Sequence, residues 1–190
     1  IVVGSSSKDC YFFYYDLPSG KMIKVPFVKG KEKFHLEKFV VSNDGTYIAS
    51  QGENGFVHIL SAKTKENVLD LKMNSVSSMS FNADSSLLFV HGKEGKVYVW
   101  DMRNSRNCLN RFVDEGCVEG TAISLSFDDQ YCVTGSDVGV VNFYNYSDVL
   151  IQSEPKPIKS LLNLTTEITT LKLINQKTMF FRTNFMQSYL

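Results

Sequence analysis

Three stretches of this chain repeat one another at a spacing of about forty residues. The first anchor of the repeat is an aspartate in a turn, at Asp44, Asp84 and Asp128. The second anchor is a glycine that always follows eleven residues later, at Gly55, Gly95 and Gly139. The third is a bulky residue five positions further on, at Leu60, Trp100 and Tyr144. Because three anchors keep one register, the sequence predicts a fold made of similar stacked units.

Each unit is predicted to consist of short β-strands. The segments are rich in β-branched and aromatic residues and are separated by turn residues; in the first unit they are 38–41, 47–50, 56–60 and 68–71. The run Asn43-Asp44-Gly45 tolerates the positive φ that a tight hairpin requires. No stretch shows the period of a helix. Four short strands in about forty residues are typical of a propeller blade, so the predicted fold is all-β, a partial β-propeller.

The repeats also predict how the chain is divided. We expect a single partial propeller over residues 1–190, with about three complete four-stranded blades and two partial ones. The predicted parts are the end of one blade at 1–33, successive repeats at 34–73, 74–113 and 114–162, and the start of a truncated blade at 163–190. A closed propeller needs about 4–8 blades. The chain is therefore expected to be a fragment that does not close a ring by itself.

Composition and spacing exclude several classes of function. The chain has 20 basic and 20 acidic residues, so it is not a nucleic-acid binder that works by bulk charge. No uncharged run reaches the length of a transmembrane helix. No two cysteines have C-x-x-C spacing, and the histidines lie far from them in sequence; the positions are Cys10, Cys108, Cys117, Cys132, His35, His58 and His91. We therefore expect no zinc site, no cofactor and a reducing intracellular compartment.

Specific runs of residues resemble a known family. Trp100-Asp101, with Gly95 five residues before Trp100, resembles the WD-repeat family. The runs 36–42, 55–66, 111–118 and 134–142 look like the U3 small nucleolar RNA-associated protein 18 family. The segment Phe112-Val113-Asp114-Glu115-Gly116-Cys117 is far more specific than a general WD-repeat motif.

The resemblance implies that the protein acts in the nucleus, within the nucleolus. It implies a non-catalytic scaffold of the U3 snoRNP, or small-subunit processome, needed for the pre-rRNA processing that yields 18S rRNA. The implied partners are other processome proteins, including other propeller subunits, with any contact to U3 RNA or pre-rRNA indirect or secondary. No membrane and no small-molecule substrate are expected. The alternatives are a WD-repeat scaffold of another assembly, such as a ubiquitin-ligase receptor or chromatin adaptor, and a propeller enzyme, which the lack of a convergent catalytic set disfavours.

Two charged segments are the first candidate partner-binding sites. Residues 21–38 contain six lysines and two glutamates, and residues 112–137 contain six acidic residues and no basic one. Both include a predicted connection between blades, so we hypothesise one face with a basic and an acidic sector that orients charged partners. The alternative is ordinary solvated loops. The candidates are Lys29, Lys31, Lys33, Asp114, Glu115 and Glu119.

A third candidate is a pair of arginines that follow the Trp-Asp dipeptide. Arg103 and Arg106 could contact RNA phosphates or the acidic groups of a protein, and the alternative is surface arginines in a turn. Trp100 and Asp101 are predicted to be structural, with the indole packed in the blade and the carboxylate buried and hydrogen-bonded. No catalytic residue is predicted.

Overall fold

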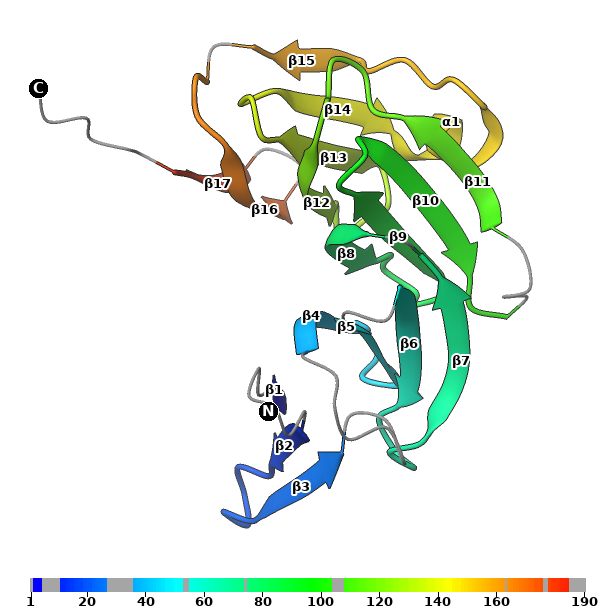
Figure 1. The fold of residues 1–190 in the computed structure, drawn as a ribbon, viewed down its shortest axis with the longest axis vertical. Coiled ribbons are helices and arrows are strands. Elements are labelled where there is room, and N and C mark those ends of the chain that lie inside the picture. Colours follow the sequence, from blue (N-terminus) through cyan, green and yellow to red (C-terminus); the bar gives the residue numbers. More distant parts are fainter. Residues whose placement is uncertain are drawn as a thin grey trace, which may run out of the picture. The chain divides into compact units, whose positions relative to one another are not determined.

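The computed structural model describes residues 2–4, 11–26, 36–52, 55–73, 75–103, 108–162, 164–175 and 178–184. It divides into two compact units, Ile1–Asn74 and Ser75–Leu190, which are described separately here. In both units every described sheet is antiparallel and is formed by strands that are consecutive in the sequence (Figure 1). The prediction of an all-β fold is confirmed. No helix in the described ranges is long and apolar enough to cross a membrane.

The first unit contains two sheets. The strands of the three-stranded sheet are β1 (Val2–Gly4), β2 (Tyr11–Tyr15) and β3 (Met22–Pro26). Those of the four-stranded sheet are β4 (Leu36–Val41), β5 (Tyr47–Gly52), β6 (Phe56–Ser61) and β7 (Asn67–Lys72). Phe12 of β2 packs in one apolar cluster with Leu36, Ile48 and Leu60, so burial of these side chains holds the two sheets together.

The second unit contains two four-stranded sheets and a hairpin. The first sheet has strands β8 (Val76–Phe81), β9 (Leu87–Gly92), β10 (Lys96–Asp101) and β11 (Cys108–Val113). The second has β12 (Gly120–Leu125), β13 (Tyr131–Ser136), β14 (Val141–Asn145) and β15 (Lys159–Leu161). The hairpin consists of β16 (Ile168–Asn175) and β17 (Thr178–Thr183).

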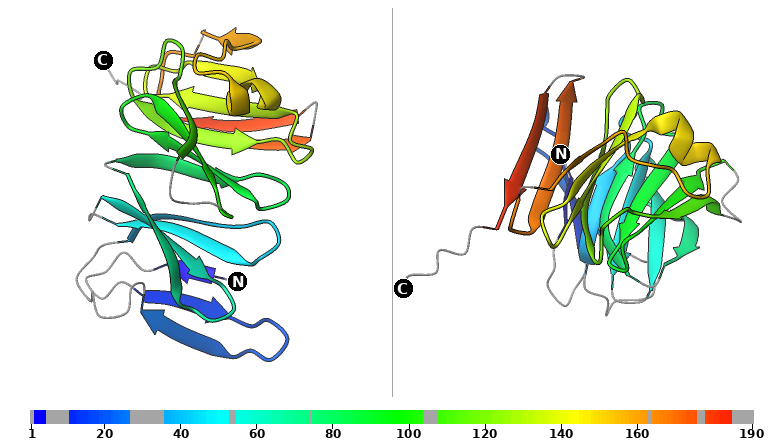
Figure 2. Two further views of the ribbon diagram at one scale, coloured as in Figure 1. Left: turned by 90° about the vertical axis from the view of Figure 1, so that its right-hand side faces the viewer. Right: turned by 90° about the horizontal axis from the view of Figure 1, so that it is seen from above.

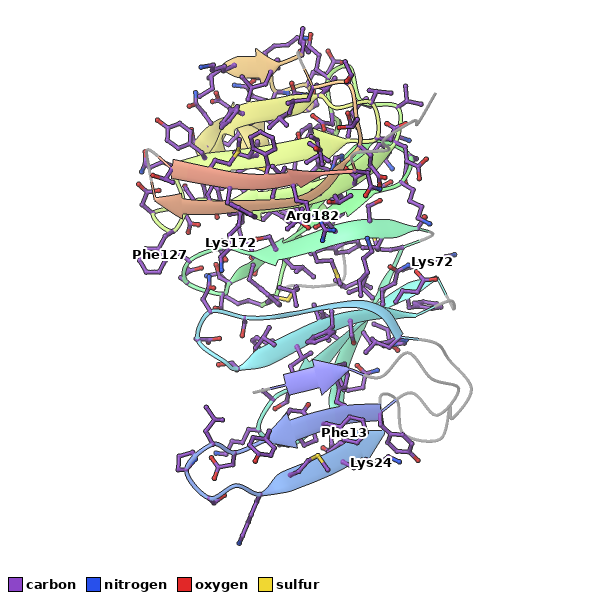
Figure 3. All side chains as sticks on the ribbon, turned by 90° about the vertical axis from the view of Figure 1, so that its left-hand side faces the viewer. Phe13, Lys24, Lys72, Phe127, Lys172 and Arg182 are labelled. Atoms are coloured by element: carbon purple, nitrogen blue, oxygen red, sulfur yellow. The ribbon has the colours of Figure 1, made fainter. Side chains whose placement is uncertain are left out.

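Stacking of these sheets forms the core of the second unit. Figure 2 shows the hairpin beside β12, and the apolar cluster at this junction includes Val133, Val141 and Ile168. The opposite face of the β12–β15 sheet contributes to a larger cluster with the β8–β11 sheet, to which Phe89 and Tyr144 belong. Lys172 and Arg182 extend from the hairpin in Figure 3, and Phe180, which lies opposite Lys172 on the same face, is 60% exposed, so this face carries both charged and apolar groups.

The repeat anchors have clear local roles. The carboxylates of Asp44, Asp84 and Asp128 accept backbone N–H groups two residues later, at 2.9, 3.0 and 3.3 Å, and so close the turns between the first two strands of each four-stranded sheet. Gly55, Gly95 and Gly139 all have φ between 69° and 84°, which favours glycine.

A short helix interrupts the all-strand pattern. Helix α1 (Tyr146–Ile151) follows β14, although the sequence shows no helical period there. Six residues are too few to display a period of 3.6, which is why the pattern was missed. The helix is fixed from outside: the Asn110 side chain on β11 donates to the carbonyls of Val149 and Gln152 at 2.6 and 2.8 Å.

Candidate functional site

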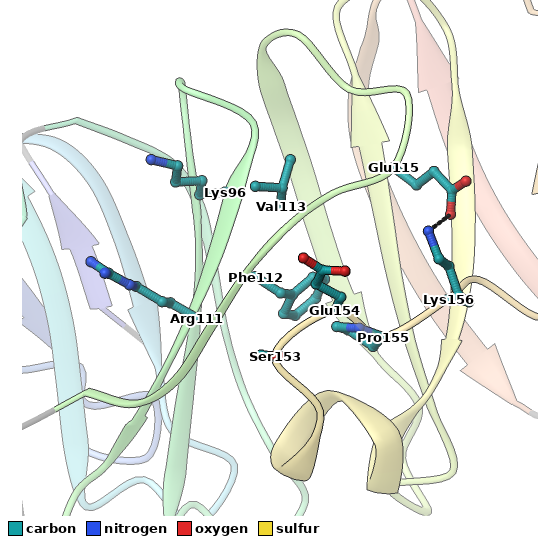
Figure 4. A pocket seen from close by; sticks show the side chains of 9 residues that line it. All are labelled: Lys96, Arg111, Phe112, Val113, Glu115, Ser153, Glu154, Pro155 and Lys156. Carbon is teal, nitrogen blue, oxygen red and sulfur yellow. Dashed lines mark ion pairs between the residues drawn. The ribbon is translucent and has the colours of Figure 1, made fainter.

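A groove of about 460 Å³ lies in the second unit, between β11 and the segment that follows α1 (Figure 4). Strands β10 and β11 contribute one wall, and residues 153–156 contribute the other. The floor and walls combine apolar side chains with charges of both signs. The lining residues are Lys96, Arg111, Phe112, Val113, Glu115, Ser153, Glu154, Pro155 and Lys156.

The position of β11 at the edge of its sheet shapes this groove. The strand pairs only with β10, so the backbone groups along its other side are not used by the sheet. Its side chains alternate: Phe112 is buried, whereas Arg111 and Val113 on either side of it are exposed. The two hydrogen bonds from Asn110 tie the opposite wall to the same strand, so the groove is built on fixed elements.

The charged residues of the groove fall into two groups, one paired and one unpaired among the described residues. Lys156 forms an ion pair with Glu115 at 3.6 Å, and both side chains are exposed, so this pair contributes little to stability. Lys96 and Arg111 project from β10 and β11, and within the described ranges neither forms an ion pair. In Figure 4 both side chains point away from residues 153–156, and the Glu154 carboxylate lies beside Phe112, so an anionic group is favoured on the exposed face of β11 next to Val113.

The structure places the predicted binding residues in different surroundings. Lys29, Lys31, Lys33 and Arg106 lie outside the described residues. Glu115 borders the groove. Glu119 is exposed, and its N–H donates to the Asp137 carboxylate at 3.2 Å. The Arg103 side chain is 74% exposed and pairs with Asp101 at 3.1 Å, a hydrogen bond that raises the pKa of Arg103.

Two burial predictions are wrong. Asp114 was expected on an exposed face, but only 1% of its side chain is exposed, because it accepts hydrogen bonds from Tyr144 and Asn142 at 2.7 and 2.8 Å across the sheet junction. A partner cannot reach that carboxylate directly. Asp101 was expected to be buried, but it is 22% exposed and faces Arg103. Trp100 is buried as predicted.

The structure also brings together a set of residues that the spacing rules did not find. The ligand-type atoms of His91, Asp114 and Cys117 all lie within 4.8 Å of one another. Nε2 of His91 is 3.4 Å from Oδ2 of Asp114 and 3.9 Å from Sγ of Cys117. Burial lowers the pKa of His91, and burial together with the Asp114 charge raises that of Cys117. No short-range motif links residue 91 to residues 114 and 117, since sheet stacking makes the contact.

Comparison with known proteins identifies relatives. No protein-family model matches the chain. A mouse protein named U3 small nucleolar RNA-associated protein 18 homolog is 42% identical over 171 residues, and the Arabidopsis thaliana protein of that name is 39% identical over 168 residues. These alignments cover 90% and 88% of this chain but 31% and 30% of the relatives. The chain thus spans about a third of the length of these curated relatives.

A solved structure shows the same fold. A chain in the crystal structure of the mitotic checkpoint complex superposes with a TM-score of 0.73 at 15% identity. The superposition covers 90% of this chain and 49% of that one. The fold is therefore a partial WD-repeat β-propeller, with the four-stranded sheets as its blades.

Proposed function

Because this chain is homologous over nine tenths of its length to proteins named U3 small nucleolar RNA-associated protein 18, we propose that it forms part of a scaffold in ribosome biogenesis. The proposed setting is the U3 snoRNP, or small-subunit processome, in the nucleolus, where the protein would support pre-rRNA processing. The observation that carries the proposal is the 42% identity over 90% of the chain. The proposed role is non-catalytic, and its partners are other processome proteins.

The groove suggests how such a scaffold binds a partner. Its open edge strand can pair with an extended segment, because β11 uses only one side of its backbone in the sheet. Lys96 and Arg111 favour an acidic residue on that segment, and the exposed side chain of Val113 favours an apolar one. The proposed ligand is an extended acidic segment of a partner protein, and contact with RNA is secondary.

The test is co-purification from nuclear extract with the tagged full-length protein that contains this chain. The unmodified protein should enrich U3 RNA and sediment with particles of pre-ribosomal size. The double variant Lys96→Glu, Arg111→Glu should lose at least one protein partner, because the charge that faces the acidic segment is reversed. The matched control is Lys63→Glu, Lys72→Glu, which changes the same charge at two exposed positions of the first unit and should retain every partner.

The outcomes separate the two parts of the proposal. A light complex that lacks U3 RNA would contradict the processome assignment and favour a scaffold of another intracellular assembly. Enrichment of U3 RNA with an unchanged set of partners in the Lys96→Glu, Arg111→Glu variant would instead contradict the groove as the docking site.

A further inference from the structure

The cluster of His91, Asp114 and Cys117 has the composition of a transition-metal site. Imidazole nitrogen, thiolate sulfur and carboxylate oxygen are the three ligand types that bind Zn²⁺ in proteins. The three residues come from two elements of the second unit, namely the end of β9 and the connection between β11 and β12. We propose that these residues form a binding site for one zinc ion. This proposal does not depend on the function proposed above.

The observed separations fit a tetrahedral ion. Bonds of about 2.3 Å to sulfur and about 2.0 Å to nitrogen and oxygen place a ligand sulfur about 3.5 Å from a ligand nitrogen, and that nitrogen about 3.3 Å from an oxygen. The corresponding distances from Nε2 of His91 are 3.9 Å to Sγ of Cys117 and 3.4 Å to Oδ2 of Asp114. Shifts of a few tenths of an ångström bring these two pairs to coordination distance, and the third pair, Asp114 and Cys117, lies within 4.8 Å.

The hydrogen bonds around the cluster orient its ligand atoms. Nδ1 of His91 lies 3.0 Å from the carbonyl oxygen of Ala122, which can only accept, so in the neutral ring Nδ1 holds the hydrogen and Nε2 presents its lone pair. Oδ1 of Asp114 already accepts from Asn142 and Tyr144, which leaves Oδ2 toward the histidine. With the ring neutral, two acceptors thus face each other in a buried place. The thiol hydrogen of Cys117 can satisfy only one of them, whereas a cation satisfies all three groups.

The same geometry argues against a catalytic triad. In a Cys-His-Asp nucleophilic set, the carboxylate and the nucleophile bind opposite nitrogens of the imidazole ring. Here both approach Nε2, and Nδ1 is bound to a backbone carbonyl. Convergence of all three groups on one point is what metal coordination requires.

The backbone is shaped to hold this cluster. A tight turn places Asp114 and Cys117 together: the N–H of Cys117 donates to the carbonyl of Asp114 at 3.2 Å, and Gly116 has a φ of +69°, as in a type II turn. A Cβ added at Gly120 would lie 2.4 Å from Nε2 of His91. The imidazole therefore packs directly on the backbone of residue 120, a close approach that requires glycine there.

Comparison of the repeats shows that the histidine is specific to one of them. His91 lies opposite Ser78 in the β8–β9 pairing. The same register position holds Gln51 in the preceding repeat and Gly135 in the following one. Cys117 is only partly buried, so an ion can enter from its side. Three protein ligands leave one tetrahedral position for water.

The first test measures zinc in the full-length protein, purified without chelator and dialysed, by inductively coupled plasma mass spectrometry. Cys117→Ser and His91→Gln should each lower the zinc content by about one ion per chain relative to the unmodified protein. The control is Cys108→Ser, which changes a partly buried thiol on β11 that donates to backbone carbonyls, and it should keep the full content. Equal zinc content in all four proteins would overturn the proposal.

A second test needs no substitution and so does not depend on whether the variants fold. The unmodified protein is treated with an alkylating reagent, with added zinc or after chelation, and the modification of each cysteine is followed by peptide mass spectrometry. Zinc should slow alkylation of Cys117 at least tenfold and leave Cys108 unchanged, because a coordinated thiolate is blocked. Equal rates at Cys117 in both conditions would reject the site.

Discussion

The second unit contains two sheet junctions that differ in chemistry at the same position of the repeat. At one junction His91 packs on β12 and contacts Asp114, and this carboxylate is bound by Tyr144 and Asn142. At the other, the equivalent residue is Gly135, and the side chain of Ile168 from the hairpin fills the space above it. At this position of the repeat, one junction therefore buries a polar network and the other packs apolar side chains.

The two junctions contribute differently: one mainly holds the sheets together, and the other fixes how they are aligned. Apolar burial is non-directional, so the Ile168 junction contributes mainly stability. A buried carboxylate and imidazole must find partners at set distances, so the His91 junction admits few alternative alignments of the two sheets. The polar junction is also the one that supplies ligand atoms for the proposed zinc ion.

The largest expected effect comes from the apolar junction. Ile168→Ala removes a fully buried side chain that packs against Val133, Val141 and Leu171. We expect a loss of about 3 kcal/mol in the free energy of unfolding, from lost burial and the remaining cavity. A urea titration of the full-length protein followed by circular dichroism measures it. Ile151→Ala is the control, since that side chain is 83% exposed and should cost little.

A paired glycine substitution tests which junction is less able to adjust. In Gly120→Ala the new Cβ would lie 2.4 Å from the buried ring of His91 and 2.6 Å from the backbone oxygen of Gly92. In Gly135→Ala its three nearest atoms would be side-chain carbons of Ile168 and Leu171, at 2.8–3.0 Å. We expect a loss of roughly 2–3 kcal/mol for Gly120→Ala and about 1 kcal/mol for Gly135→Ala in the same titration. Equal losses would show that the two junctions adjust equally.

The features that the sequence could predict are those that depend on contacts between residues close together in the chain. The turns at Asp44, Asp84 and Asp128 depend on side chains that bind their own backbone two residues away, so a short pattern reveals them. The strands could also be predicted, because each depends on the residue types within its own short segment. Helix α1 could not be predicted, because its position is set by Asn110 on a different strand rather than by its own six residues.

The candidate site depended on contacts that no local pattern contains. Asp114 lies in an acidic stretch, and charge alone predicted exposure. Its burial follows from Asn142 and Tyr144, 28 and 30 residues further along the chain, which satisfy the carboxylate. The signal that could have found the cluster is the repeat itself: aligning the units shows His91 where the others have Gln51 and Gly135, but it does not show that Cys117 lies beside it.

A smaller effect is expected from the hydroxyl that links the two sheets at the polar junction. Tyr144→Phe removes the O–H that donates to Asp114 at 2.7 Å and accepts from the N–H of Glu115 at 3.0 Å. The ring stays buried, so the loss should be about 1–2 kcal/mol in the free energy of unfolding, from two groups left with fewer partners. Tyr131→Phe is the control, because the hydroxyl of this partly buried side chain forms no hydrogen bond with the described residues and its loss should change stability little. A loss for Tyr144→Phe as small as that for Tyr131→Phe would contradict a structural role for the network.

The smallest effect concerns a second polar contact between the same two sheets. Asp129 has a φ of 52° and accepts the N–H of Ala83 at 3.0 Å. Burial raises the pKa of Asp129, and the charges of Asp84 and Asp128 add to this shift. Asparagine also tolerates a positive φ and keeps an acceptor for the Ala83 N–H. Asp129→Asn should therefore be as stable as the unmodified protein at neutral pH or more stable by up to about 0.5 kcal/mol.

The pH dependence of the stability difference between Asp129→Asn and the unmodified protein shows whether the Asp129 carboxylate is destabilising. A carboxyl whose pKa is higher in the folded than in the unfolded chain binds its proton more readily when folded, so its contribution to stability falls as the pH rises from the unfolded pKa through the folded pKa. The advantage of Asp129→Asn should accordingly shrink as the pH is lowered from neutrality toward the acidic range in which Asp129 is protonated. Urea titrations at several pH values, with Glu154→Gln as the control at an exposed carboxylate of the same unit, measure this trend. An advantage that instead grows on acidification would mean that the Asp129 carboxylate is stabilised, not penalised, at the junction.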